Sequence, residues 1–373
     1  MSYSELPSSA SEFLKKCISG RSDAPIEYVP VSFRKRNGQV GDRRSNAHQL
    51  HWYPAKMFYR IPIDILDALK LPRGSVVLDP FCGSGTVLVE SRLRGYTAIG
   101  FDINPLSVLI SRVKTTPLHG PTAATHLESI CQQAKALRRI PGPDVLPHFW
   151  FRIPARNALY RLLQAIDMQS MDPPYKDFFR ATLTSIVRRS SLADPNIPPL
   201  VRLRPERIET AGPRYKRAYE RAMAVTNNTV YTDFASAATQ NIQFVGHENA
   251  DVKLPPAIVF RKSALATELA NQSVDLVVTS PPYCGAQKYV RTFKLELGLL
   301  GLNQAEIGSI DHQTLGTERI TRATSRKPRH LSSSQQKIIQ AVRNRDSGRA
   351  TVLETYLAGL EVFAEELARI MRP

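Results

Sequence analysis

The sequence predicts an α/β protein built on an open, mainly parallel sheet. Two short apolar runs, residues 75–79 and 97–101, flank a glycine-rich turn and a helical stretch at 86–93. Two further apolar runs follow much later, at 257–260 and 274–278. Short apolar runs rich in β-branched residues are typical of strands buried on both faces of a parallel sheet. We therefore expect loops with functional groups at the carboxyl edge of these strands.

Length and charge limit the classes of protein to consider. The 373 residues carry 50 Lys and Arg against 33 Asp and Glu, a formal net charge of +17, and 42% of them are hydrophobic. This chain can bury a sizeable core, in one large domain with an insertion or in two domains. The basic surplus favours a polyanionic partner, although it can also serve solubility alone. No run approaches the roughly 18 apolar residues of a membrane span, and the start lacks a signal-peptide pattern, so we expect a cytoplasmic protein without a membrane partner.

We expect three regions along the chain. Residues 1–47 are polar and predict a loosely packed N-terminal arm. Residues 48–115 and 251–373 contain the strand signals and form the expected catalytic domain. Residues 116–250 lack strand signals and are rich in Pro, Arg and helical stretches, which predicts a helical, basic insertion between the second and third strands.

A glycine-rich turn follows the first predicted strand. Residues 79–86 read Asp-Pro-Phe-Cys-Gly-Ser-Gly-Thr, and Asp102 ends the next strand 23 residues after Asp79. Backbone N–H groups of such a turn can approach a ligand closely, and the later carboxylate can accept hydrogen bonds from ribose hydroxyls. The turn lacks the GxGxxG spacing of dinucleotide sites and the lysine of a P-loop. It therefore predicts a nucleoside ligand without a polyphosphate, although a GxG turn alone can be purely structural.

A second motif, Ser280-Pro281-Pro282-Tyr283, stands at the carboxyl end of the last apolar run. Its two prolines fix the backbone and remove two donors, which leaves a hydroxyl and carbonyl oxygens as acceptors beside an aromatic ring. Such a site suits an exocyclic amine stacked on Tyr283. Accepting the amine's hydrogen bonds at Ser280 Oγ and the Pro281 carbonyl would localise the nitrogen lone pair for attack on an electrophilic methyl. A structural proline turn is the alternative.

Together these motifs resemble the cofactor and catalytic motifs of S-adenosylmethionine-dependent DNA amino-methyltransferases, the cytosine-N4 and adenine-N6 family. Residues 51–58, His-Trp-Tyr-Pro-Ala-Lys-Met-Phe, are similar to the segment that precedes the cofactor motif in this family and helps wall the methionine pocket. The resemblance covers 51–105 and about 258–302. It implies a Rossmann-like methyltransferase sheet, S-adenosyl-L-methionine as cofactor, double-stranded DNA as partner, and a restriction-modification system. By position, 116–250 would be the target-recognition region.

The resemblance also implies roles for single residues. Asp79 and Gly83 would hold the methionine moiety, and Asp102 the ribose. The implied cofactor-binding residues are Tyr53, Lys56, Asp79, Phe81, Gly83, Gly85, Thr86, Asp102 and Asn104. The implied catalytic residues are Ser280, Pro281, Pro282 and Tyr283. The family's acid after the third strand has no clear counterpart, and Ser263 stands where an adenine contact is expected.

Three other features compete for the chemistry. Residues 171–175, Met-Asp-Pro-Pro-Tyr, match an adenine-type catalytic motif more closely than 280–283, but the residues before them read as a helix rather than a buried strand. Cys82 and Cys284 lack a histidine placed to activate them, so we expect packing roles and not the covalent chemistry of cytosine carbon methylation. The histidines show no metal-ligand spacing, and we predict no metal.

Two stretches concentrate positive charge. Residues 202–221 hold seven Lys or Arg against three Glu, inside the insertion. Residues 319–349 hold nine against one acid, Asp346, and predict a mobile basic loop before a long helix at 352–371. Either run alone is readily explained as a solvated face. Beside a base-modifying site, the two together favour contacts to phosphates.

Several alternatives remain open at this level. Ser280 favours cytosine N4 over adenine N6 by resemblance alone. An RNA or tRNA guanine methyltransferase and a DNA-binding protein with an inactive methyltransferase fold are the rivals. Only about four strands are predicted where methyltransferases of this type have seven, so the strand bearing Ser280 should lie at an edge with unpaired backbone N–H and C=O groups. We therefore expect a chain truncated at its C-terminus, or one half of a split enzyme, that alone methylates weakly or not at all and has a complementing C-terminal polypeptide as a partner. The alternative is that residues 115–250 supply the missing strands.

Overall fold

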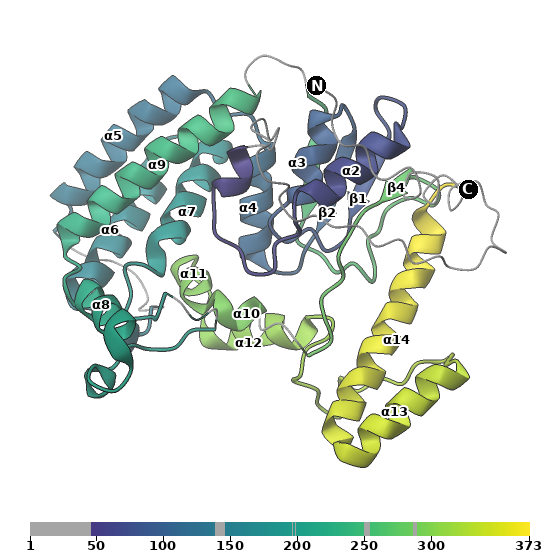
Figure 1. The fold of residues 1–373 in the computed structure, drawn as a ribbon. Coiled ribbons are helices and arrows are strands. Elements are labelled where there is room, and N and C mark those ends of the chain that lie inside the picture. The colour runs from purple at the N-terminus through teal and green to yellow at the C-terminus, as the bar shows by residue number, and fades with distance from the viewer. Residues whose placement is uncertain (1–45, 139–145, 196, 198, 250–253, 286–288) are drawn as a thin grey trace, which may run out of the picture.

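The computed structural model describes residues 46–138, 146–195, 197, 199–249, 254–285 and 289–373. The expected N-terminal arm at 1–47 thus lies almost entirely outside the described residues. Figure 1 shows a small sheet with α2, α3 and α4 packed beside it, a group of helices on one side and a long helical hairpin on the other.

A four-stranded parallel sheet lies at the centre of the described residues. The strands are β1 (Val76–Asp79), β2 (Thr97–Phe101), β3 (Ala257–Phe260) and β4 (Leu276–Val277). Their order is β3-β2-β1-β4, with Leu78 of β1 opposite Ile99 of β2 and Val277 of β4. Leu78 is fully buried, as expected for a central strand. The predicted α/β class with a parallel sheet is confirmed.

Helices α2, α3 and α4 cover this sheet and position its loops. They span Arg60–Leu69, Thr86–Leu93 and Pro105–Thr115. Every residue of α3 from Thr86 to Arg92 is buried, so this helix is packed on all sides. Helix α4 begins at Pro105, and Asn104 caps it by accepting a hydrogen bond from the N–H of Leu106 at 3.0 Å. Helix α3 thus starts shortly after the carboxyl end of β1, and α4 starts shortly after the carboxyl end of β2.

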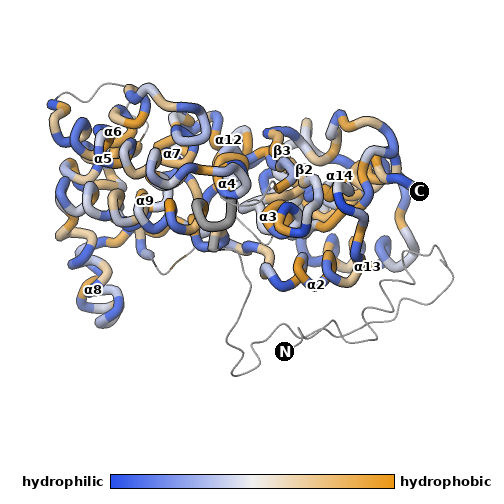
Figure 2. Tube along the Cα trace, turned by 90° about the horizontal axis from the view of Figure 1, so that it is seen from above, coloured by the Kyte–Doolittle hydropathy of each residue, from blue (hydrophilic) through white to orange (hydrophobic). Residues whose placement is uncertain are grey.

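The segment between β2 and β3 is helical, as predicted. Its helices beyond α4 are α5 (Gly120–Ala136), α6 (Ile153–Met168), α7 (Pro173–Val187), α8 (Gly212–Met223) and α9 (Asn227–Asn249), with 3₁₀ turns η2 (His148–Trp150) and η3 (Pro205–Arg207). Phe178, Phe179 and Phe234 are almost fully buried in a core that α5, α6, α7 and α9 share. Helix α8 stands apart, is mostly hydrophilic (Figure 2), and packs through Tyr215 on a separate small cluster with Leu203.

The C-terminal part corrects one expectation. Its helices are α10 (Tyr289–Thr292), α11 (Lys294–Leu299), α12 (Gln304–Gln313), α13 (Ser333–Arg345) and α14 (Ser347–Ile370). The prediction of a mobile loop at 319–349 is wrong for residues 333–345, which form α13. Ser332 and Gln335 make a reciprocal capping box at its start, and Ile339 buries its apolar side chain. Helix α14 begins at 347 rather than 352, because the Asp346 side chain caps it.

Strand β4 lies at one edge of the sheet, as predicted for the strand before Ser280. The expectation of unpaired backbone groups on that edge needs a correction at Val274. Its N–H donates to the Ile370 carbonyl at 3.0 Å, and its carbonyl accepts from the N–H of Arg372 at 2.9 Å. The residues after α14 thus cover part of the edge. Across the described ranges, no helix combines the length and apolar character needed to cross a membrane.

Candidate cofactor and base site

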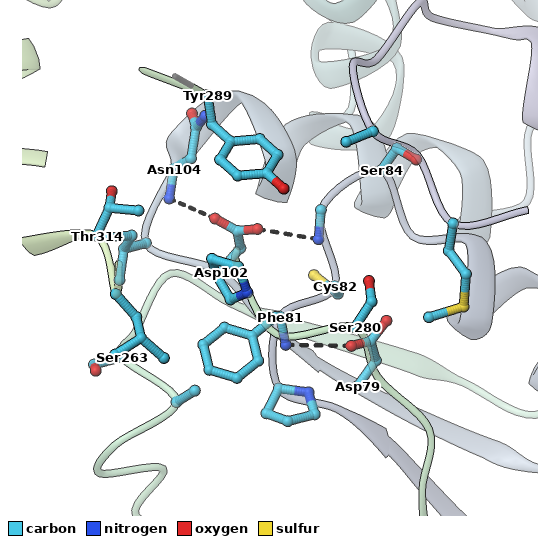
Figure 3. A pocket seen from close by; sticks show the side chains of 18 of the residues that line it. Asp79, Phe81, Cys82, Ser84, Asp102, Asn104, Ser263, Ser280, Tyr289 and Thr314 are labelled. Atoms are coloured by element: carbon cyan, nitrogen blue, oxygen red, sulfur yellow. Dashed lines mark hydrogen bonds between the residues drawn. The ribbon is translucent and has the colours of Figure 1, made fainter. Parts of the chain in front are cut away.

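One cleft opens at the carboxyl ends of the strands and brings the predicted motifs together. Its empty space is about 940 Å³ when the open solvent at its mouth is counted. Its lining comes from residues 53, 55–57, 79–84, 86, 102–104, 262–265, 280, 282, 289–290 and 313–315. Figure 3 shows Asp79, Asp102 and Ser280 among these side chains. Segments up to about 260 residues apart in sequence therefore share one site.

Asp79 joins the ends of two strands. Its buried carboxylate accepts hydrogen bonds from the Phe81 N–H at 3.2 Å and from Thr279 Oγ1 at 2.7 Å. Thr279 precedes Ser280, so this contact fixes the start of the Ser280 segment next to the glycine-rich loop. Burial raises the pKa of Asp79 to about 7, and the two hydrogen bonds lower it in part.

Asp102 lies across the glycine-rich loop at the end of β2. Its carboxylate accepts from the N–H of Gly83 at 3.0 Å and from the N–H of Asn104 at 2.8 Å (Figure 3). Each carboxylate oxygen keeps a further lone pair, so ribose hydroxyls can still bind to it. Burial raises the pKa of Asp102 to about 6. Asp102 thus lies in the cleft beside the loop, and its role toward the ribose stays a prediction.

The two glycines of the loop serve different purposes. Gly83 has φ +48° and lies under the Tyr53 ring, whose Cε1 would be 3.4 Å from an added Cβ. Gly85 has φ +76°, and an added Cβ would lie 2.9 Å from Ser111 Oγ and 3.0 Å from Ser111 Cα. Gly85 does not line the cleft. It allows α3 and α4 to approach each other, which makes its role structural in this geometry.

The predicted segment 51–58 forms a wall of the cleft. Tyr53 donates or accepts a hydrogen bond with Ser107 Oγ at 2.7 Å, and burial holds its pKa well above the usual value. Lys56 Nζ donates to the His48 carbonyl at 2.7 Å. His48 in turn bonds Glu90 of α3 at 2.7 Å, which fastens η1 (Asn46–Gln49) to the sheet domain. Both predicted residues of this segment, Tyr53 and Lys56, line the cleft.

Two other predicted cofactor contacts carry polar atoms without partners. Thr86 Oγ1 and Asn104 Nδ2 are buried and make no hydrogen bond within the described residues. Both residues line the cleft, as do Phe81 and Ser263. Buried polar groups are normally hydrogen-bonded, so these two atoms are suited to a polar ligand. The residues of this wall therefore fit a nucleoside cofactor.

The Ser280–Tyr283 segment is accessible from outside. Ser280 is exposed at the cleft and Pro282 lines it, whereas Pro281 and Tyr283 do not. Tyr283 is 57% exposed, which is high for a large aromatic side chain. The ring of Tyr283 and the Ser280 side chain are therefore each accessible to a partner.

The competing motif at 171–175 has a different setting. Pro173, Pro174 and Tyr175 form the first turn of α7, and Tyr175 packs against the insertion core with His126 at 5.3 Å. None of the three lines the cleft. Proline in the first helical turn explains this Pro-Pro pair without any chemistry.

The two cysteines near the site are poor nucleophiles. Burial raises the pKa of the Cys82 thiol well above its usual value, and burial also raises that of Cys284. Both thiols therefore stay protonated, in agreement with the packing roles expected for them.

Several residues of the site carried no usable signal in the sequence. Tyr289 and Val290 line the cleft from α10, and Gln313, Thr314 and Leu315 line it from the end of α12. Lys114 is buried behind the glycine-rich loop and donates to the Ser84 carbonyl at 2.8 Å. Burial holds the pKa of Lys114 well below its usual value. The sequence hints at Tyr289 alone, because it is an aromatic residue shortly after Tyr283. Residues 313–315 are brought to the cleft by the tertiary fold.

The architecture of this site is consistent with a methyltransferase fold. It combines a parallel sheet with a glycine-rich loop, a following acid and a Ser-Pro-Pro-Tyr segment around one cleft. Residues 32–111 match the model of a family described as DNA methylase, with N6 and N4 members. By this match the chain is similar to the N6/N4 DNA methylases, a family that uses S-adenosylmethionine as methyl donor.

Distant homologues are type II methyltransferases. The chain is 25% identical to M.MvaI of Kocuria varians over 378 residues, which cover 93% of this chain and 80% of that protein. It is 21% identical to M.BsoBI of Geobacillus stearothermophilus over 76% of this chain and 58% of the relative. It is 24% identical to M.AvaI of Nostoc sp. over 62% of this chain and 49% of that relative. The matched part is thus about half the length of the last two relatives. No solved structure matches the chain.

Proposed function

We propose that this protein transfers a methyl group from S-adenosylmethionine to the exocyclic amine of a flipped base in DNA, with cytosine N4 as the target atom. The observation that carries this proposal is the single cleft lined by both Asp102 and Ser280. The family supports DNA as the substrate, and the type II relatives support a role in a restriction-modification system. The choice of cytosine rests on the resemblance of Ser280-Pro-Pro-Tyr to the N4 motif.

The chain's own groups account for cofactor binding. Asp102 is placed to accept ribose hydroxyls, and Asp79 with Gly83 to hold the methionine end. Thr86 Oγ1 and Asn104 Nδ2 supply polar atoms that have no other partner in the described structure. When bound, the cofactor supplies a methyl group on a positively charged sulfur, which leaves as a neutral thioether.

The Ser280 segment accounts for the amine. The Ser280 hydroxyl and the Pro281 carbonyl accept the two N–H bonds of the amine, while Tyr283 stacks on the base. This arrangement holds the nitrogen lone pair toward the cleft. Because Ser280 is exposed, water can take the proton that the methylated amine releases.

DNA contacts are proposed on two surfaces. On α8, the side chains of Arg214, Lys216, Arg217 and Arg221 are exposed, while Tyr215 anchors the opposite side of the helix. The second surface is the α13–α14 hairpin with the residues that lead into it. In Figure 1, α10 and α12 lie between this hairpin and α8. We propose the insertion at 116–250, which contains α8, as the target-recognition region.

The charge of the second surface is lower than its sequence suggests. Arg343 pairs with Glu354 at 2.6 Å, and Arg329 pairs with Glu361 and Glu365 of α14. These arginines serve the hairpin itself. We therefore propose α8 as the stronger of the two phosphate-binding surfaces.

Nucleoside analysis of methylated DNA tests the proposal. The purified chain is incubated with isotope-labelled S-adenosylmethionine and mixed-sequence DNA, and the digested nucleosides are separated. Labelled N4-methylcytosine is expected. N6-methyladenine would refute the choice of base, and label on RNA in place of DNA would refute the substrate. Cofactor binding without any transfer would favour an inactive DNA-binding fold.

A further inference from the structure

The Ser280–Tyr283 segment is held at few points. Thr279 binds Asp79 on one side, and on the other the N–H of Gly285 donates to the Gly316 carbonyl at 2.9 Å. Between these contacts, residues 280–284 make no backbone–backbone hydrogen bond within the described part of the chain. The position of this loop therefore depends on what packs against it.

Gly316 packs against the backbone of this loop. An added Cβ at Gly316 would lie 2.9 Å from the Tyr283 carbonyl oxygen and 3.3 Å from Cys284 Cα. Gly316 also has φ +79°, where residues with a side chain are strained. The contact involves backbone atoms of Tyr283, a proposed catalytic residue, and of Cys284 after it, so no rotamer change can relieve it.

The turn that carries Gly316 is firmly anchored to α12 and α14. Thr314 Oγ1 donates to the Ile310 carbonyl at 2.9 Å, and Arg319 pairs with Asp311 at 3.0 Å. Leu315 fits against α14 at Gly359, where an added Cβ would lie 2.4 Å from Leu315 Cδ1. A collision at Gly316 would therefore displace the loop at Tyr283 more easily than it would displace the turn.

Three consecutive residues of this turn face different partners. Thr314 and Leu315 line the cleft, Leu315 also contacts α14, and Gly316 contacts the loop. We propose that this turn sets the distance between the cofactor cleft and the base-binding loop, with Gly316 as a positioning residue for Ser280 and Tyr283. The inference rests on the proposed function and adds a residue that does not touch the substrate.

Matched glycine variants separate this role from general destabilisation. Gly316→Ala introduces both the φ strain and the collision. Gly301→Ala introduces φ strain alone, since Gly301 has φ +93° and nothing within 4 Å of an added Cβ. Gly308→Ala, within α12, introduces neither, because it has helical backbone and open space.

Single-turnover methylation, cofactor affinity and thermal unfolding are measured for all three variants. At saturating DNA and cofactor, Gly316→Ala should methylate on the order of tenfold more slowly per folded molecule, because small misplacements of reacting groups are costly. Its cofactor affinity should stay within about threefold of wild type, as the loop and not the ribose site moves. Gly301→Ala should melt at a lower temperature but methylate normally, and Gly308→Ala should change neither. Equal rates for Gly316→Ala and Gly301→Ala would overturn the proposal.

A second variant and a second measurement keep the test informative. If Gly316→Ala does not fold, Gly316→Asn replaces it, because asparagine tolerates positive φ and still carries the colliding Cβ. Hydrogen exchange at the Gly285 amide reports the loop without any activity. Exchange should be faster in the Gly316 variant than in Gly301→Ala, and equal exchange would refute the positioning role. If the wild-type protein does not methylate DNA, the proposed function is refuted. The exchange measurement still tests the positioning role of Gly316, because it does not depend on activity.

Discussion

Replacing Asp102 by alanine removes the acid proposed to bind the ribose of the cofactor. The carboxylate now holds two backbone N–H groups, of Gly83 and Asn104, and has a lone pair left on each oxygen. A hydrogen bond to a charged group contributes about 1.5–3 kcal/mol, so cofactor affinity should fall roughly 10- to 150-fold. Asp102→Asn keeps one acceptor oxygen and should lie between alanine and wild type.

Isothermal calorimetry with S-adenosylmethionine measures this directly. Thermal unfolding must accompany it, since the N–H groups of Gly83 and Asn104 lose their acceptor in Asp102→Ala and the loop can loosen. Asp172→Ala serves as the control, because Asp172 is an exposed acid before α7 with no cap hydrogen bond. Undiminished affinity in folded Asp102→Ala would remove this residue from the site.

Three further outcomes are expected. Tyr283→Ala should bind cofactor normally but methylate roughly 5- to 150-fold more slowly, since stacking on a base contributes about 1–3 kcal/mol; a defect in Tyr175→Ala instead would shift the site to α7. Cofactor affinity should fall as the pH drops below about 6, because the free protein then protonates Asp102 and binding requires the ionised form, and titration of Asp102→Asn should lose this part of the dependence. In filter binding, log K for DNA should decline against log[salt] with a slope near −4.5 if about five phosphates are neutralised, and a flat line would mean that the basic surplus does not contact DNA.

The sequence predicts the parts of the fold that are locally encoded. Strands β1 and β2 read clearly, because buried parallel strands are nearly all apolar, and the loop between them carries its own glycine signal. The place of Asp102 in the cleft follows from the same unit. Strand β4 was placed correctly at an edge, although only Leu276 and Val277 pair as a regular ladder.

The rest depends on contacts between distant residues. The charges of 333–345 resemble a solvated run and predict a loop, yet a capping box and packing on α14 make this segment helix α13. No local pattern shows that Thr279 binds Asp79, 200 residues away, or that Thr314 reaches the cleft. Such residues are identified by topology, and topology depends on the whole chain.

The way the helical insertion joins the sheet has a consequence for how this protein can change. Arg112 near the end of α4 donates to the Val259 carbonyl of β3, so the chain leaves the sheet domain close to the point where it returns. The entropy of closing a loop rises only with the logarithm of its length. Helices α5, α6, α7 and α9 also bury a core largely of their own. Natural variants can therefore lengthen, shorten or exchange this segment at little cost to the strands that carry Asp79 and Asp102.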